Sequence, residues 1–316
     1  MRNSLRLTVA AACLLSAASS ALAAGTWVPA NVPTGGSTFT VFGINNKSVV
    51  TGAYTNSSGL IEGVVGPFDG SNYTSFSDSG SGTQPRGLND GGTIMGFDTG
   101  TLQQWERSAS GTMKNITQGG NPVAVALAQG VNKAGTFAGD YTNSSAVEVG
   151  ATGTKAKYKN AFKLKVSNTG YAGRAIDTAG DVAGWYFDSS GIQHGYVNMV
   201  GATKPIKVDV PNAFYTVVEG LNDKGIASGQ WEDNSGVIHG FVYDIAKKKY
   251  TSLDAPGSTF TQVWGINNSG VVAASAALST GTGSFAYCMT SKGCPAHAGV
   301  VSTQQRPSGR AVPQAN

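Results

Sequence analysis

Charged side chains are scarce in this chain of 316 residues, at 13% against about 25% in typical soluble domains. Glycine, by contrast, is twice as frequent as usual, with 44 residues. Low charge combined with abundant Gly, Ser, Thr and Asn favours many short strands joined by tight turns, and argues against helical bundles and coiled coils. Hydrophobic residues still make up 40% of the chain, enough to build a substantial core.

The chain begins with a short apolar stretch rather than a charged or strand-like segment. Residues 1–23 place Arg2 and Arg6 before a run of small apolar residues that ends in Ala-Leu-Ala, as in a Sec-type signal peptide. We therefore predict export, to the periplasm or the cell exterior. No second apolar run of about 18 residues follows, so no membrane span is expected. Without the signal, 20 basic and 18 acidic residues remain, and this balance is too even for nucleic-acid binding.

Cysteine is rare, with three residues in the chain. Cys13 lies in the predicted signal, which leaves Cys288 and Cys294 six residues apart near the other end. An even number of cysteines in an exported protein favours a disulfide. Two thiols without a nearby histidine pair make a poor metal site, and no metal or other cofactor is predicted.

One short motif recurs along the chain: a small residue, an aliphatic residue, an Asn or Asp, and a polar residue. Its copies are Gly43-Ile44-Asn45-Asn46, Gly87-Leu88-Asn89-Asp90, Gly130-Val131-Asn132-Lys133, Ala175-Ile176-Asp177-Thr178, Gly220-Leu221-Asn222-Asp223 and Gly265-Ile266-Asn267-Asn268. The spacings are 44, 43, 45, 45 and 45 residues, which indicates six copies of one structural unit.

Each unit resolves into four strand-like pieces, most clearly in the fifth copy, at 213–221, 226–231, 237–244 and 247–253. Four short strands per unit of about 45 residues are typical of a β-propeller blade. The sixth copy lacks a fourth strand, and Thr26 to Gly35 resembles the missing piece. We predict an all-β fold: one six-bladed propeller over 24–292, closed by an N-terminal strand in the last blade, with a flexible tail at 293–316.

These repeats also resemble a known family. The pattern Gly-Ile-Asn-Asn-x-Gly, with His-Gly-Tyr at 194–196, His-Gly-Phe at 239–241 and Asp-Ala-Pro-Gly at 254–257, is similar to bacterial HAF-type extracellular repeat proteins. The resemblance covers most of residues 26–290 and implies export and a repeat fold rather than a reaction. The other copies depart from the family pattern because they lack this histidine.

Several repeated polar residues are candidates for a site or for structure. The turn residues Asn45, Asn89, Asn132, Asp177, Asn222 and Asn267 fit a structural role, because such side chains bond the backbone of their own turn. The alternative is a ring of ligands around one face. His194 and His239 occupy equivalent positions in adjacent blades, too far apart to share a metal ion. We expect each imidazole to bond backbone at a blade interface.

Aromatic residues follow the glycine of the second strand in several blades, at Tyr54, Tyr141, Tyr186 and Trp231. Their ring faces suit a sugar-binding surface, and this makes them the candidate ligand-binding residues. The competing interpretation is packing between neighbouring blades.

Motifs for catalysis are missing: the sequence has no Gly-x-Ser-x-Gly, no His-Glu-x-x-His, no Walker loop and no calcium loop. Catalytic residues therefore stay unassigned, although carboxylates such as Glu62, Glu106, Glu148, Glu219 and Glu232 are present. The leading hypothesis is a secreted, non-catalytic binding module for a polysaccharide, a cell-surface polymer or a protein. The alternative is an extracellular polymer-degrading hydrolase or lyase whose site lies at one mouth of the propeller channel.

Overall fold

The computed structural model describes residues 25–78, 81–118, 121–122, 127–166, 168–279, 281–290 and 293–295. Within these ranges the chain forms 26 strands and no helix, so the predicted all-β class is confirmed. None of these residues belongs to a helix long and apolar enough to cross a bilayer. The predicted signal at 1–23 and nearly all of the predicted tail lie outside the described residues.

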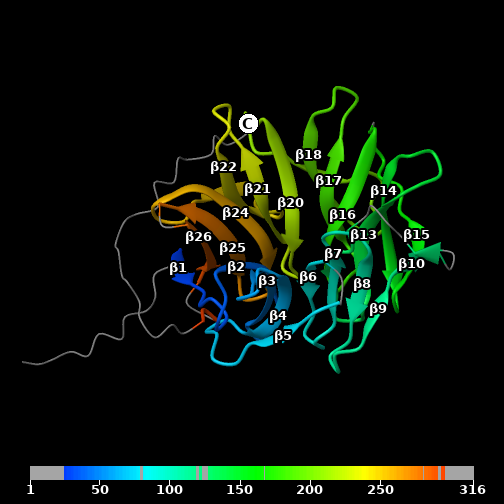
Figure 1. The fold of residues 1–316 in the computed structure, drawn as a ribbon. Coiled ribbons are helices and arrows are strands. Elements are labelled where there is room, and N and C mark those ends of the chain that lie inside the picture. Colours follow the sequence, from blue (N-terminus) through cyan, green and yellow to red (C-terminus); the bar gives the residue numbers. More distant parts are fainter. Residues whose placement is uncertain are drawn as a thin grey trace, which may run out of the picture.

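The strands form six sheets, antiparallel apart from one strand pair in the third, that follow one another around the molecule (Figure 1). The first sheet contains β2 (Thr38–Ile44), β3 (Val49–Thr55), β4 (Ile61–Pro67) and β5 (Thr74–Phe76). The second contains β6 (Thr83–Leu88), β7 (Ile94–Asp98), β8 (Gln104–Arg107) and β9 (Met113–Asn115). The third contains β12 (Gly130–Val131), β13 (Thr136–Thr142), β14 (Glu148–Thr154) and β15 (Lys157–Ala161), with the added strands β10 (Thr117–Gln118) and β11 (Asn121–Pro122).

The other three sheets repeat this order of strands. The fourth contains β16 (Gly170–Ile176), β17 (Val182–Phe187), β18 (Gln193–Asn198) and β19 (Ile206–Val208). The fifth contains β20 (Tyr215–Leu221), β21 (Ile226–Glu232), β22 (Ile238–Asp244) and β23 (Lys249–Leu253). The sixth contains β24 (Ser258–Ile266), β25 (Val271–Leu278), β26 (Gly281–Cys288) and β1 (Thr26–Pro29).

The first strand of each sheet lies innermost. Strands β2, β6, β12, β16, β20 and β24 contact one another in that order, and β24 contacts β2 to close the ring. The fold is therefore the predicted six-bladed β-propeller. In the sixth blade, β1 pairs antiparallel with β26, and Trp27 lies opposite Tyr287.

The third blade differs from the predicted four strands. Strand β10, which belongs to the end of the second repeat, pairs in parallel with β15 through Thr117 and Lys157, and β11 pairs with β10. This addition covers an edge that four strands alone would leave open, and an open strand edge invites pairing with other chains.

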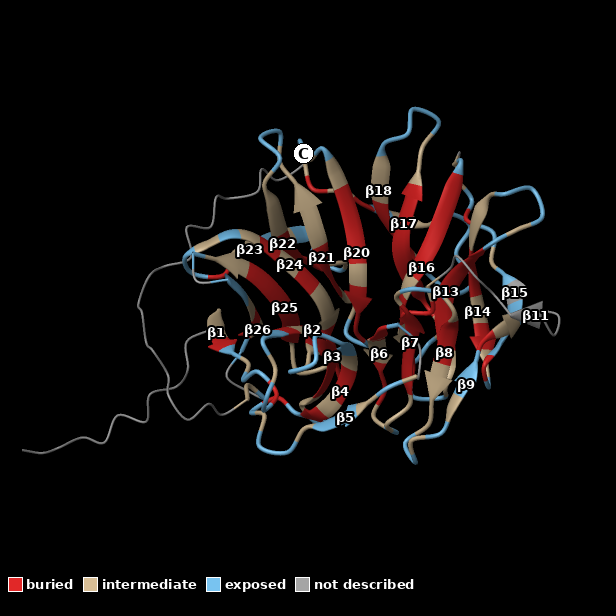
Figure 2. Ribbon diagram, viewed as in Figure 1, coloured by how far each residue is buried: buried red, intermediate tan, exposed pale blue. Residues whose placement is uncertain are grey.

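The core consists of side chains packed between neighbouring blades, and the buried positions concentrate on the strands (Figure 2). Trp105, which is 1% exposed, packs edge-on against Phe76 of the preceding blade. Cys288, the last residue of β26, and Cys294 form the predicted disulfide, with Cα atoms 5.5 Å apart.

The turn that ends each inner strand is held by its Asn or Asp. In the fifth blade, Asn222 Oδ1 accepts the backbone N–H groups of Lys224 and Ile226 at 3.0 Å each. Its Nδ2 donates to the carbonyl of Asn267 in the next blade at 2.9 Å. The same donation to the next blade occurs from the other asparagines, Asn45, Asn89, Asn132 and Asn267. A belt of five hydrogen bonds therefore links the blades.

The belt is interrupted between the fourth and fifth blades, where Asp177 replaces the asparagine. Asp177 Oδ1 fixes its own turn through Gly180 and Asp181, but a carboxylate has no N–H to donate to Asn222. Burial raises the pKa of this carboxyl, and the nearby carboxylates of Asp181 and Asp223 add to the rise.

Replacing Asp177 with asparagine is therefore expected to stabilise the protein at neutral pH. The new Nδ2 would donate the sixth bond of the belt, worth about 1 kcal/mol. Chemical denaturation at pH 7 measures the change. The matched control is Asn267→Asp, which removes an existing belt donor and should lower stability by a similar amount. If Asp177→Asn and the unmodified protein are equally stable, the added side chain forms no stabilising hydrogen bond between the fourth and fifth blades.

Candidate functional site

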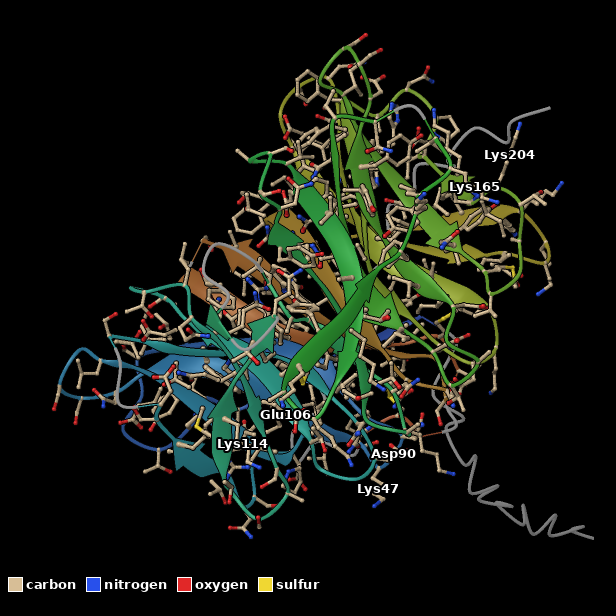
Figure 3. The ribbon with its side chains drawn as sticks, turned by 90° about the vertical axis from the view of Figure 1, so that its right-hand side faces the viewer. Lys47, Asp90, Glu106, Lys114, Lys165 and Lys204 are labelled. Atoms are coloured by element: carbon tan, nitrogen blue, oxygen red, sulfur yellow. A yellow bond between two sulfur atoms is a disulfide. The ribbon has the colours of Figure 1, made fainter. Side chains whose placement is uncertain are left out.

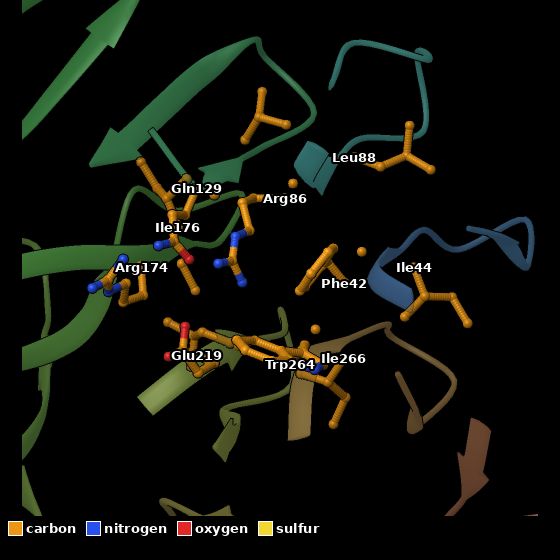
Figure 4. A pocket seen from close by; sticks show the side chains of 18 residues that line it. Phe42, Ile44, Arg86, Leu88, Gln129, Arg174, Ile176, Glu219, Trp264 and Ile266 are labelled. Carbon is orange, nitrogen blue, oxygen red and sulfur yellow. The ribbon is translucent and has the colours of Figure 1, made fainter. Parts of the chain in front are cut away.

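One position of the repeat does not repeat. It is the residue immediately before the small residue of each motif, and its occupants are Phe42, Arg86, Gln129, Arg174, Glu219 and Trp264. The two residues that follow are uniform, a small residue and then an aliphatic one. All six variable side chains line a cavity of about 90 Å³ on the axis of the propeller (Figure 4). We call this set the channel ring.

A β-bulge aims four of these side chains into the channel. In the first blade, the pairing of β2 with β3 passes from Val41 directly to Gly43, so Phe42 is the extra residue. The same shift passes over Arg86, Arg174 and Glu219 in their blades. Bulges frequently redirect a side chain near a functional site. The channel ring is thus set by a backbone irregularity that is itself repeated.

Three side chains of the channel ring carry charge. Among the described residues, the guanidiniums of Arg86 and Arg174 and the carboxylate of Glu219 form no ion pair within 4.0 Å and no side-chain hydrogen bond. Three of their nitrogen atoms are buried and have no hydrogen-bond partner among the described residues: Arg86 Nε, Arg86 Nη1 and Arg174 Nε. Figure 4 shows Arg86 and Glu219 reaching into the cavity from different sides. Unpaired charges away from bulk water are costly, so this arrangement suits a bound partner.

The environment shifts the pKa of two of these groups. Desolvation lowers the pKa of Arg86 to about 10; Glu219 opposes the change and Arg174 adds to it. Desolvation also raises the pKa of Glu219, against the effect of both arginines. At neutral pH Arg86 stays protonated, so the channel ring presents fixed positive charge.

Aromatic rings lie around the Arg86 guanidinium. Its Cζ lies 4.2 Å from the ring centroid of Phe42 and 4.9 Å from that of Trp264. Trp264 is held in turn by a hydrogen bond from its Nε1 to Ser275 Oγ at 3.1 Å. Such cation–π contacts stabilise the charge but leave the N–H edge of the guanidinium free. Arg86 is therefore a rigid donor group.

The channel widens beyond the inner-strand turns into a second space of about 210 Å³. Its rim consists of the polar residues that follow the turn asparagines, namely Asn46, Asp90, Lys133, Thr178, Asp223 and Asn268. Several of them bond across blades; for example, Asn46 Nδ2 donates to Asp90 Oδ2 at 2.9 Å. Lys47 also binds Asp90: its Nζ donates to the Asp90 backbone carbonyl at 2.8 Å (Figure 3). This wider space gives a polar route to the channel ring.

The predicted aromatic binding residues do not form an open surface. Tyr54, Tyr141 and Tyr186 are between 6% and 8% exposed, and Trp231 is partly buried. Tyr141 packs on Tyr158, and Trp231 stacks on His239 at 4.6 Å. These contacts favour the packing interpretation, and ligand binding by the four rings stays an untested prediction.

The two histidines bond side chains, where backbone partners were expected. His194 Nδ1 lies 2.6 Å from Asp209 Oδ2, and Nε2 lies 3.1 Å from Asp188 Oδ2. His239 is placed in the same way, between Asp254 and Asp233. The backbone expectation was wrong because both of these repeats supply an aspartate on either side of the histidine. No group of three potential metal ligands is present among the described residues.

Sequence reasoning missed the channel ring, apart from naming Glu219 among scattered carboxylates. The signal was available as a position of the repeat that varies in chemistry directly before two positions that hardly vary. Without the bulge, however, nothing in the sequence says which way this position points.

No family model and no curated protein sequence matches the chain. Solved structures do resemble its fold. A streptogramin B lyase is 10% identical with a TM-score of 0.52, over 84% of this chain and 98% of the lyase. TolB from Acinetobacter baumannii is 8% identical with a TM-score of 0.51, over 69% of this chain and 54% of TolB. The Aleuria aurantia lectin is 9% identical with a TM-score of 0.50, over 80% and 93%. At these identities the likeness establishes the propeller fold alone.

Proposed function

We propose that this chain is an exported, non-catalytic binding propeller that recognises a polysaccharide, a cell-surface polymer or another protein through its channel ring. The observation that best supports this proposal is the channel ring. Its charged groups, the guanidiniums of Arg86 and Arg174 and the carboxylate of Glu219, have no hydrogen-bond or ion-pair partner among the described residues. Unpaired charges away from bulk water destabilise a protein whose role is purely structural, so their presence at a variable position of the repeat supports a ligand site.

Export and the HAF-type resemblance are part of this proposal. The disulfide between Cys288 and Cys294 supports export, because such bonds persist in oxidising compartments. The aspartates beside His194 and His239 are consistent with a repeated structural role for the His-Gly motif.

A second candidate is the extracellular hydrolase or lyase, and Glu219 favours it. A partly buried carboxyl with a raised pKa fits a general acid or base. Yet Glu219 is the sole carboxylate among the described residues that line the narrow cavity. Hydrolysis of a glycoside ordinarily uses two carboxylates about 5–9 Å apart, so binding is the better-supported function.

The test is co-sedimentation of the purified protein with chitin, cellulose, peptidoglycan and polyesters, with the supernatants assayed for released products. We expect pelleting with one polymer and no release. Arg174→Met should reduce the bound fraction at least tenfold, because a charge-assisted contact in a shielded site contributes about 1.5–3 kcal/mol. The matched control is Lys114→Met, which removes a positive charge from the exposed surface.

Two outcomes would contradict the proposal. Binding that Arg174→Met leaves intact would place the site outside the channel. Product release that is lost in Glu219→Gln would make the protein an enzyme.

A further inference from the structure

We infer that the group held by the channel ring is a small 2-hydroxy carboxylate, with its carboxylate on Arg86 and Arg174 and its hydroxyl on Glu219. This inference rests on the proposed function, because it takes the channel ring as the ligand site. It adds the chemical class of the ligand, which the fold leaves open.

The carboxylate follows from the donors. Arg86 Nε and Nη1 and Arg174 Nε are unpartnered N–H groups among the described residues. Nε and Nη1 lie on different edges of the planar Arg86 guanidinium, so each of its two edges carries an unpartnered N–H group. A planar guanidinium edge matches the two oxygens of a carboxylate better than it matches a single acceptor atom. Gln129, 7% exposed, lines the same cavity and adds an amide.

The charge of the ligand follows from the balance inside the cavity. Among the residues that line the cavity, two guanidiniums and one carboxylate leave one excess positive charge, which a ligand of charge −1 neutralises. The Asp140 carboxyl, which interacts with Arg174, does not line the cavity. A dianion such as phosphate would leave excess negative charge beside Glu219, and a zwitterion would leave the positive charge uncompensated. Because charges in a shielded site interact strongly, this balance discriminates among otherwise similar ligands.

The hydroxyl follows from Glu219. An ionised carboxylate is acceptor-only, and this one accepts no hydrogen bond from the described residues. A ligand that satisfies it must carry a donor close to its own carboxylate. An ammonium would also donate, but it would place a further positive charge beside Arg86 and Arg174. A hydroxyl on the neighbouring carbon supplies the donor without added charge.

Size and apolar walls complete the description. A cavity of about 90 Å³ admits a group of a few heavy atoms rather than a sugar chain. Phe42 and Trp264, which form one side of the channel ring, offer their rings to the C–H groups of such a ligand. The aliphatic residues of the motifs, among them Ile44 and Leu88, line the same space.

The test uses four molecules of nearly equal shape as calorimetric probes: lactate, propionate, alanine and lactamide. Lactate has both the charge and the hydroxyl; propionate lacks the hydroxyl, alanine replaces it with an ammonium, and lactamide lacks the charge. We expect lactate to bind with a Kd of about 1 mM and at least tenfold tighter than each of the others.

Variants of the channel ring locate the binding. Arg174→Met and Arg86→Met should each weaken lactate binding at least tenfold, whereas Lys114→Met should leave it unchanged. Both channel variants remove an unpaired charge, so they should fold; circular dichroism checks this. Glu219→Gln removes the balancing negative charge, and we expect it to bind inorganic phosphate at least tenfold tighter than the unmodified protein does.

Equal binding of lactate and propionate, or lactate binding that survives Arg174→Met, would overturn the inference. So would failure of lactate to bind while a polymer still pellets in an Arg174-dependent way, and that result would leave the proposed function standing. Displacement of a pelleted polymer by lactate would place the 2-hydroxy carboxylate on the polymer. Lactate binding without displacement would make a free acid the ligand, and both results support the inferred class.

Discussion

Replacing Gly87 with alanine is expected to lower the free energy of unfolding by about 3 kcal/mol, at the upper end of the range for overpacking. A Cβ added at Gly87 would lie 1.9 Å from the backbone carbonyl oxygen of Gln129 in the next blade. A backbone atom held in the ring of inner strands cannot move aside as a flexible side chain can. The substitution therefore forces neighbouring blades apart at the channel.

The matched control is Gly265→Ala, at the same motif position in the sixth blade. There an added Cβ would lie 3.1 Å from the carbonyl oxygen of Phe42, a contact that a shift of a few tenths of an ångström relieves. We expect a loss below about 1 kcal/mol. The fourth blade already carries Ala175 at this position. Urea denaturation compares the two variants, and equal losses would contradict the explanation by interblade contact.

Replacing Asp140 with asparagine is expected to stabilise the protein by about 1–3 kcal/mol at pH 8, the usual cost of an unsatisfied buried polar group. Asp140 is 1% exposed on β13. Its Oδ2 accepts the N–H of Leu127 at 3.2 Å, while its Oδ1 has no partner among the described residues. Desolvation raises the pKa of this carboxyl well above its ordinary value; Arg174 opposes the rise and Glu148 adds to it.

The sign of the pH dependence follows from this raised pKa. As the pH rises above about 3.9, an unfolded Asp140 gives up its proton while the folded one keeps it, so the unfolded state is favoured. The loss grows until the pH passes the folded pKa. The Asp140→Asn variant lacks this titration, so its advantage should be clear at pH 8 and small at pH 4.

Urea denaturation of both proteins at pH 4, 6 and 8 measures the effect. The control is Asp244→Asn, because the hydrogen bond from Lys247 lowers the pKa of Asp244 and its carboxylate is favourable when folded. That substitution should reduce stability at pH 8. If Asp140→Asn instead destabilises the protein equally at pH 4 and pH 8, Arg174 compensates the buried carboxylate fully.

The repeat in the sequence was sufficient to predict the architecture. Six copies of the motif at 43–45 residue spacings fixed the number of blades. In the fifth blade, the four predicted pieces correspond to β20, β21, β22 and β23 within about two residues at each end. This succeeds because strand alternation, turn residues and spacing are local properties, and each blade repeats them.

The added pair β10 and β11 was not predicted, because it depends on where the end of one repeat meets the edge of the next blade. The partners of His194 and His239 were mistaken for a related reason. Strand pairing aligns Asp188 and Asp209 on either side of the imidazole, and that alignment is a property of the sheet.

By itself, then, the sequence determined the class, the blade number, the four strands of the repeated unit and the disulfide, because all of these follow from periodicity and short-range chemistry. Only the tertiary structure decided that Phe42, Arg86, Gln129, Arg174, Glu219 and Trp264 meet in one cavity. These residues are about 45 positions apart, and no local rule relates them. A repeated bulge turns Phe42, Arg86, Arg174 and Glu219 inward, and closure of the ring brings all six positions around one cavity.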